Sequence, residues 1–335
     1  MKLSGLQIAR GLAALSIVYF HSWVILLSFP KDTDQPIQVL KLWGYLSIDF
    51  FFAISGFVIC LVVSRSKFLV RSFLIKRAFR LYPMYWLCLL AYAATGLLRG
   101  PVPTETVGYF LYSATLLPTN GYPFYDVAWS LQHEMLFYVV AAITVPIIGL
   151  RGLSFLLFAS ASTAIWLDVP LHNLPISKYH ADFLAGVLAF MSQPHLRKFG
   201  SIAPFVIGAC GIYFVATRGL ADYFCFPFFA LITAAANFEG KDAPAERLGD
   251  ISYSMYLVHP LVFGVGYKIV GMLQPLPIWV EEPIRWAAII VCVAVSYATW
   301  ALIEKPMIAL GETVSEAAVA ALERPRIASV EERRH

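Results

Sequence analysis

The sequence contains few charged residues. Asp, Glu, Lys and Arg make up 14% of its 335 residues, whereas soluble globular domains contain about 25%. Hydrophobic residues make up 59% of the chain, and the mean hydropathy is +0.70. A single packed core cannot hide that much apolar surface from water. The composition therefore argues against a soluble enzyme, a disordered regulator and a coiled coil, and it predicts an all-α polytopic membrane protein.

The sequence also lacks the motifs of soluble enzymes and of metal or disulfide scaffolds. A P-loop, GxGxxG, HExxH and GxSxG are all absent. No CxxC pair occurs, and single cysteines in apolar stretches are typical of small packing residues. We therefore expect neither a bound metal nor a nucleic-acid partner. The five cysteines are Cys60, Cys88, Cys210, Cys225 and Cys292.

What the sequence does contain is a series of apolar runs, about ten of which approach the roughly 20 residues that a membrane-spanning helix needs. The sixth run is short and contains His180 and Asp182, so nine or eleven spans are alternatives. The first run is too long for the apolar core of a signal peptide, so we expect it to be retained. We expect a membrane domain over 1–310 and a cytoplasmic tail over 311–335. The predicted spans are 6–28, 42–64, 79–98, 128–149, 152–168, 180–193, 201–217, 222–238, 251–273 and 284–304.

The basic residues predict how the chain is oriented in the bilayer. If the N-terminus is cytoplasmic, 18 of the 25 Lys and Arg residues lie on the cytoplasmic side, as the positive-inside rule requires. This bias predicts that both termini are cytoplasmic and that the number of spans is even. The densest basic stretch, residues 65–80, then lies in a cytoplasmic loop.

Arg10 and His21 are candidate functional residues of the first span. They are eleven residues apart, and at about 100° per residue both side chains lie on one helix face, roughly 16 Å apart along the axis. A long donor with a charged head could therefore lie along this face. An imidazole titrates near neutral pH and can act as a general base. The alternative is a packing histidine bonded to a neighbouring helix.

Asp49 and Glu134 are acidic residues six to seven positions inside their predicted spans. Ionisable groups in spans are costly and usually face the bundle interior. The spans that carry them begin on the outer side of the membrane, where the first span ends. Asp49 and Glu134 are therefore predicted to share a depth with His21. A carboxylate near His21 would stabilise the charged imidazole. Alternatively, both residues only form structural hydrogen bonds between helices.

Arg77 and Arg80 are three residues apart and lie on one helical face at the start of the third span. Guanidinium groups suit phosphate oxygens. The simpler interpretation is that topology alone places basic residues at a cytoplasmic helix end. For His259, which precedes Pro260, we favour a side chain lining a helix kink. Glu304, which closes the last span, is read as an interfacial ion-pair partner.

Taken together, these residues resemble the acyltransferase 3 family of integral membrane acyltransferases, and the overall pattern is similar to bacterial exopolysaccharide-production acyltransferases. The matching stretches occur in family order over residues 5–306. His133 departs from the pattern, which expects an uncharged residue there. The stretches are Arg10-x10-His21, Ile48 to Phe57, Arg77-x2-Arg80-x2-Pro83, Trp129-Ser130-Leu131-x2-Glu134-x2-Phe137-Tyr138, Ser252-x-Ser254-x-Tyr256-Leu257-x-His259-Pro260 and Glu304-Lys305-Pro306.

The resemblance implies an enzyme in a bacterial inner membrane that moves an acyl group, expected to be acetyl, from cytoplasmic acyl-CoA to a sugar hydroxyl. Its partners are then a saccharide acceptor and the lipid bilayer. His21 becomes the expected catalytic base, with Glu134 and Asp49 as supporting residues. Arg10, Arg77 and Arg80 become the expected contacts of the donor phosphates. The alternative function is a transporter or flippase of lipid-linked sugars, which the lack of an obvious internal repeat disfavours.

Overall fold

The computed structural model describes residues 3–29, 35–65, 68–97, 104–119, 121–170, 173–240 and 245–332. Within these ranges the chain forms helices and no strand, which confirms the all-α prediction. Seven basic residues counted in the predicted orientation lie outside the described residues, as do the side chains of Arg324 and Arg326. The seven are Lys2, Lys31, Lys67, Arg99, Lys241, Arg333 and Arg334.

Thirteen α-helices and seven short 3-10 or π segments follow one another along the described chain. They are α1 (Ser4–His21), η1 (Ser22–Leu26), α2 (Gln38–Trp43), η2 (Gly44–Leu46), α3 (Ser47–Val63), α4 (Val70–Leu97), α5 (Thr104–Ser113), η3 (Asp126–Ala128), α6 (Trp129–Trp166), α7 (His180–Leu196), η4 (Arg197–Phe199), α8 (Ile202–Thr217), η5 (Ala221–Tyr223), α9 (Cys225–Asn237), α10 (Ala245–Asp250), α11 (Ser252–Met272), η6 (Ile278–Val280), α12 (Glu281–Thr299), η7 (Trp300–Glu304) and α13 (Lys305–Glu332).

Five helical stretches of the described chain are long and apolar enough to cross a membrane, so the predicted count of ten is not confirmed. Two further helices, Ile202–Thr217 and Ala221–Asn237, are apolar but shorter. One of the long stretches, Asp126–Trp166, contains the predicted span 128–149 and most of the predicted span 152–168. The five stretches are Ser4–Leu26, Gln38–Val63, Asp126–Trp166, Ser252–Met272 and Ile278–Ala321.

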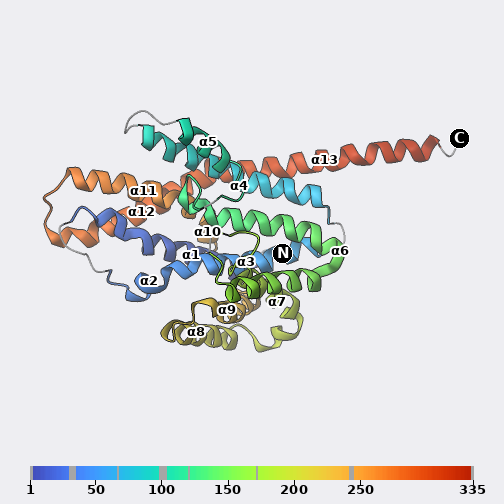
Figure 1. Ribbon diagram of the computed structural model, residues 1–335, viewed down its shortest axis with the longest axis horizontal. Helices are drawn as coiled ribbons and strands as arrows, with labels where there is room; N and C mark the ends of the chain where they lie inside the picture. The colour runs from blue at the N-terminus through green and yellow to red at the C-terminus, as the bar shows by residue number, and fades with distance from the viewer. Residues whose placement is uncertain are drawn as a thin grey trace.

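Helix α6 is broken at Gly149, which lies at the boundary between those two predicted spans. The φ and ψ angles of Gly149 are 69° and −177°, a conformation that glycine adopts without the steric cost of a Cβ. The two arms of α6 fold back on each other at this point (Figure 1). The first arm, which begins at Trp129, carries Glu134.

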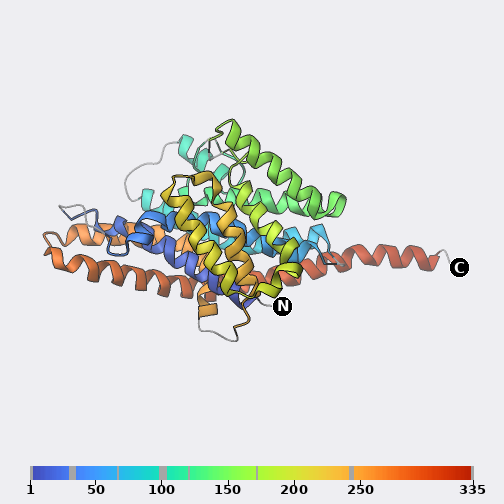
Figure 2. The ribbon, with the colours of Figure 1, turned by 90° about the horizontal axis from the view of Figure 1, so that it is seen from below.

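Helix α1 lies at the centre of the bundle. It contacts α3, α9, α10 and α11, and three of its sides belong to three apolar clusters, represented by Ile17, Val18 and Leu6. The hairpin of α11 and α12 lies on one flank of the bundle and the hairpin of α8 and α9 on another (Figures 1 and 2). Burial on three sides fixes the directions in which the polar residues of α1 point.

Helix α13 leaves the body of the protein, and the predicted domain boundary at residue 310 lies inside it. Its first half packs on α4, where the hydroxyls of Ser72 and Ser315 are 2.6 Å apart and Gly311 lies against Phe79. The remainder of α13 projects beyond the bundle (Figures 1 and 2).

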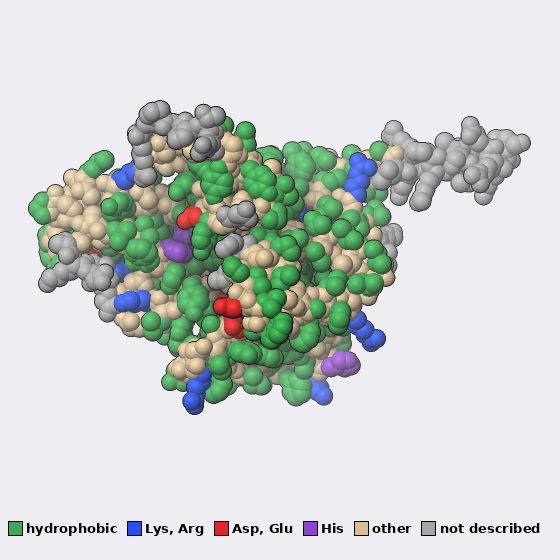
Figure 3. All heavy atoms as spheres, viewed as in Figure 1, with side chains coloured by type: hydrophobic (Ala, Val, Ile, Leu, Met, Phe, Trp, Pro, Cys, Tyr) green, Lys and Arg blue, Asp and Glu red, His purple; other side chains and the backbone are tan. Residues whose placement is uncertain are grey.

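The outer surface is apolar where helices face outward. Large side chains such as Trp166, Ile202 and Met272 are 78–83% exposed. On the face shown in Figure 3, hydrophobic side chains cover the middle and the Lys and Arg side chains lie around its edges. Exposed apolar surface on this scale is stable in lipid and not in water. The structure thus agrees with a membrane protein.

Candidate active site

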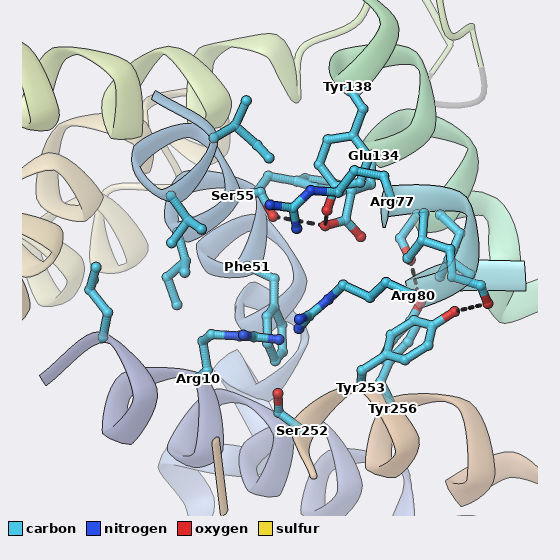
Figure 4. Close-up of a pocket in the computed structure, with 18 of the residues that line it drawn as sticks. Arg10, Phe51, Ser55, Arg77, Arg80, Glu134, Tyr138, Ser252, Tyr253 and Tyr256 are labelled. Atoms are coloured by element: carbon cyan, nitrogen blue, oxygen red, sulfur yellow. Dashed lines mark hydrogen bonds between the residues drawn. The ribbon is translucent and has the colours of Figure 1, made fainter. Parts of the chain in front are cut away.

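A cavity of about 460 Å³ opens between α1, α3, α4, α6 and α11 (Figure 4). Most of its lining is apolar, and the charged side chains in it are those of Arg10, Arg77, Arg80 and Glu134. All four are predicted site residues from separate parts of the sequence. Ligand sites are typically apolar cavities with a few convergent polar groups, so this arginine cavity is the main candidate site.

The three guanidinium groups converge because α4 presents Arg77 and Arg80 on one face, opposite Arg10 of α1. Figure 4 shows Arg10 and Arg80 directed into the same space. Within the described part of the chain, neither Arg10 nor Arg80 has a carboxylate within salt-bridge distance. The guanidinium carbon of Arg77 lies 5.3 Å from the ring centre of Phe73 and 5.2 Å from that of Tyr138. Three positive charges that line one mostly apolar cavity repel one another, and this arrangement favours the binding of an anionic ligand.

Glu134 faces these arginines and is fixed by two hydroxyl groups. The Oγ of Ser55 on α3 donates a hydrogen bond of 2.9 Å to its Oε1 atom, and the hydroxyl of Tyr138, one turn further along α6, donates to the same oxygen. Arg10 and Arg77 both interact electrostatically with this carboxylate. Glu134 therefore offsets part of the positive charge of the cavity, while the rings of Phe73 and Tyr138 hold Arg77.

His21, the predicted base, does not line the arginine cavity. It is the last residue of α1, and its ring packs on that of His259 with centroids 5.1 Å apart. His259 is 1% exposed, and its Nδ1 lies 2.7 Å from the carbonyl oxygen of Tyr256. This is the carbonyl that Pro260 leaves without its helical donor. Because a carbonyl only accepts, Nδ1 carries the proton in this bond, and the predicted kink-lining position of His259 agrees with the geometry.

Asp49 lies in a second cavity, of about 660 Å³, together with Asp182. Neither His21 nor Glu134 lines it. On α3, Asp49 and Ser55 are six residues apart, which places their side chains about 120° apart around the helix. When Ser55 faces Glu134, Asp49 therefore faces elsewhere. The structure brings Glu134 to the three arginines and keeps His21 and Asp49 in separate surroundings.

Several residues of the arginine cavity had no predicted role. Tyr253 and Tyr256 of α11 line it and are hydrogen-bonded: the hydroxyl of Tyr253 donates to the carbonyl of Leu81 at 2.7 Å, and Ser130 donates to the hydroxyl of Tyr256 at 2.7 Å. The signal for these residues was available, because an apolar span that begins with four hydroxyl side chains in five residues is unusual.

Glu304 is buried within the protein, and its place at the membrane interface stays a prediction. It is 2% exposed and accepts a hydrogen bond of 2.7 Å from Ser254. It shares a cavity of about 220 Å³ with Arg10, Arg80 and Lys305. Glu304 is the last residue of the π-helical turn η7, Trp300–Glu304, a type of irregularity that is frequent at functional sites. Glu304 therefore adds negative charge behind the arginines.

The described part of the chain contains no group of three or more His, Cys, Asp or Glu side chains arranged to hold a metal ion. The chemistry that this arrangement offers is anion binding by guanidinium groups, together with proton transfer at an imidazole.

Comparison with known proteins identifies the family of the chain. The sequence pattern of the acyltransferase domain that defines the acyltransferase 3 family matches residues 3–303. The exopolysaccharide production protein ExoZ of Rhizobium meliloti (strain 1021) is 25% identical over 304 residues, which cover 80% of this chain and 90% of that protein. No solved structure matches the chain. Since the family pattern covers nearly the whole sequence, the chain belongs to the acyltransferase 3 family of membrane acyltransferases.

Proposed function

We propose that the protein is an acyl-CoA-dependent O-acyltransferase of a bacterial inner membrane. It transfers an acyl group, expected to be acetyl, to a sugar hydroxyl of an exported polysaccharide or its lipid-linked precursor. The family supports the acyltransferase activity, and the name of the R. meliloti relative supports a polysaccharide acceptor. The observation that carries the choice of donor is the convergence of three arginines in one cavity.

In this proposal Arg10, Arg77 and Arg80 bind the phosphates of acyl-CoA. Arginine forks form paired, charge-assisted hydrogen bonds with phosphate oxygens. The cavity also contains Leu3 and Gln7 from the start of α1, and this end is cytoplasmic in the predicted orientation, where acyl-CoA is available. Glu134 limits the repulsion among the cations before the donor binds.

The acyl end of the donor then extends toward His21. Arg10 and His21 lie on one face of α1, roughly 16 Å apart along the axis. The arginine cavity reaches Tyr256, whose carbonyl bonds His259, and His259 packs on His21. On the face of α1 between Arg10 and His21 lie Ala14 and Ile17, both buried, so in this proposal these contacts open when the acyl end of the donor approaches the two histidines.

The proposed reaction is a direct transfer. Neutral His21 accepts the proton of the acceptor hydroxyl while that oxygen attacks the thioester carbonyl. The new C–O bond forms as the C–S bond breaks, and the CoA thiolate leaves. The imidazolium then returns the proton to the thiolate, so ester and CoA thiol are the products. Asp49 is proposed to act on the acceptor side, since it lines the second cavity and not the arginine cavity.

The test is transfer of labelled acetyl from acetyl-CoA to saccharide in membranes. His21→Gln keeps a hydrogen-bonding side chain but cannot take up a proton at neutral pH, so the rate should fall about 10²–10⁴-fold. The matched control is His195→Gln, at an exposed histidine near the end of α7, which should leave the rate unchanged. A normal rate in His21→Gln at equal abundance would assign the base elsewhere. Saccharide transport without acetyl transfer in the wild type would favour the flippase.

A further inference from the structure

The second cavity, which we call the acidic cavity, combines carboxylates with aromatic rings. Its lining includes Asp49 and Asp182 together with the aromatic side chains of Tyr45, Trp129 and Tyr179. It lies where α3, α6 and α7 begin and next to η5. In the predicted orientation all of these ends are on the side opposite the cytoplasm.

Asp182 is the most informative residue of this cavity. It is 7% exposed and borders the cavity in the first turn of α7. Among the described residues its carboxylate has no hydrogen-bond donor, and its electrostatic neighbour is the second carboxylate, Asp49. A buried acceptor without a donor is costly. This cost is removed when a ligand that carries hydrogen-bond donors fills the cavity.

The rim of the acidic cavity is held in place by its own contacts. The Nζ atom of Lys178 lies 3.0 Å from Asp168 and 3.3 Å from Asp222, so it ties the segment after α6 to η5. Below the rim, Nε2 of His133 lies 3.2 Å from the Oγ of Ser177. His133 is the residue that departs from the family pattern, and here it supports the wall beside Trp129. Asp168 and Asp222 of the lining are thus paired with Lys178, whereas Asp49 and Asp182 have no cation within salt-bridge distance among the described residues.

The lining selects a neutral, hydroxyl-rich ligand. Two carboxylates repel phosphate, which the arginine cavity attracts, so the two cavities favour opposite ligands. Carboxylate oxygens accept hydrogen bonds from hydroxyl groups, and aromatic faces such as those of Trp129 and Tyr179 pack on apolar C–H surfaces. Sugar rings present both hydroxyl groups and C–H faces.

The acidic cavity is also placed to deliver its ligand to the proposed reaction. Ile48 lines both cavities, and Trp129 of the acidic cavity is followed directly by Ser130 of the arginine cavity. The ring of Tyr45 packs on Phe20, whose other neighbour is the ring of His21. A sugar in the acidic cavity therefore lies beside both the donor cavity and the end of α1 that carries His21.

We propose that the acidic cavity is the saccharide-binding site, in which Asp182 and Asp49 accept hydrogen bonds from sugar hydroxyls and Trp129 and Tyr179 pack on the ring. This proposal rests on the proposed transfer to a sugar for its biological meaning, but binding can be measured without any donor. Donor and acceptor then approach from opposite sides of the membrane, and only the acyl group has to pass between the cavities.

The probe is a set of oligosaccharides prepared from the host's own surface polysaccharide and freed of acyl groups by mild alkali. Binding to the purified protein in lipid nanodiscs is followed by tryptophan fluorescence without acyl-CoA. Asp182→Asn should weaken binding at least tenfold. The control is Glu239→Gln. Glu239 lies just after the C-terminal end of α9, away from the acidic cavity, and its exposed carboxylate pairs with Arg197. This variant should bind like the wild type. Tyr45→Ala, at a residue 43% exposed, tests the site even if Asp182→Asn does not fold.

The outcomes separate this site from the reaction. Weaker saccharide binding in Asp182→Asn or Tyr45→Ala, with an unchanged apparent KM for acetyl-CoA, supports the site. If the saccharide binds in this way but no acetyl transfer occurs, the site stands and the reaction is wrong. If the wild type does not bind the oligosaccharides, or if both variants bind them normally, the site is wrong whatever the transfer rate.

Discussion

Arg77 and Arg80 differ from the other basic residues of α4 in their surroundings. Arg71, on the same helix, is exposed, whereas Arg77 and Arg80 line the arginine cavity. Topology requires only that a cation lies near the cytoplasmic end of the helix, and Arg71 satisfies that requirement. The position of the other two inside the bundle is therefore better explained by a ligand.

Replacing Arg77 and Arg80 together by Gln should raise the apparent KM for acyl-CoA about 10²–10⁴-fold. The reason is the loss of charge-assisted hydrogen bonds, which contribute about 1.5–3 kcal/mol each. Lys at both positions should restore only part of the affinity, because it keeps the charge and loses the planar fork. Arg71→Gln is the matched control and should have no effect. Donor titrations at saturating acceptor measure the change, and an unchanged KM in the double Gln variant would assign the pair to topology alone.

Tyr138→Phe should lower the transfer rate about tenfold, because it removes a hydrogen bond to Glu134. Glu134 then loses orientation relative to Arg77, which also packs on the Tyr138 ring. The ring itself remains, so folding should be preserved. Tyr213→Phe, at a residue 64% exposed, is the control for the loss of a hydroxyl. A wild-type rate in Tyr138→Phe would show that Ser55 alone holds Glu134.

At the level of helices, α3 and α7 pack so closely that their contact leaves no room for a side chain. A Cβ atom added at Gly186 would lie 1.9 Å from the carbonyl oxygen of Ala53, and one added at Gly56 would lie 2.2 Å from that of Phe183. Small residues that allow backbones to approach are typical of helix contacts in membranes. This contact holds Ser55 toward Glu134 and the start of α7 at the acidic cavity.

Gly186→Ala should therefore destabilise the protein by about 1–3 kcal/mol or more, since overpacking forces backbone shifts. The same change at Gly264 of α11, where nothing lies within 4 Å of the added Cβ, should be neutral or slightly stabilising, because Ala is the better helix former. Thermal unfolding of both variants in detergent distinguishes the two signs. Equal melting temperatures would show that α3 and α7 separate easily.

Sequence reasoning predicted an all-helical chain, which is confirmed, because helices follow from local rules; the role of the three arginines stays a prediction. Apolar runs predicted helices, and the three-residue spacing of Arg77 and Arg80 predicted a shared face. Arg77 and Arg80 line one cavity with Arg10 and Glu134, which come from two other matching stretches of the sequence. The count of ten spans was not confirmed, because breaks such as Gly149 and short helices such as α8 depend on packing rather than on composition.

The relation between separate helices could not be predicted in the same way. His21, Asp49 and Glu134 were placed at one depth, but depth does not specify the angle of each helix about its own axis. Those angles are determined by contacts between helices, such as Gly56 of α3 against Gly186 of α7. The sequence of one span does not show which residues of another span it will contact. The same reason explains why Asp182, noted only as a charge in a short span, was not recognised as a neighbour of Asp49.

For the whole molecule, the two cavities suggest a division of the protein across the bilayer. The arginine cavity includes the start of α1, and the acidic cavity includes the starts of α3 and α7. Donor and acceptor sites on opposite sides would allow a cytoplasmic acyl group to reach an exported polysaccharide without exporting CoA. This arrangement depends on the orientation of the chain in the membrane.

The orientation itself is a prediction of the 18 basic residues counted on one side of the membrane. A membrane-impermeant maleimide should label Ser64→Cys, at the exposed end of α3, only after the inner membrane is opened. It should label Thr217→Cys, at the exposed end of α8, in spheroplasts that are still sealed. Cys210 and Cys225 are replaced by Ala beforehand, because neither is buried. Cys60, Cys88 and Cys292 are buried and can stay. The reverse labelling pattern would place the arginine cavity on the outer side, away from cytoplasmic acyl-CoA, and would overturn the proposed mechanism as a whole.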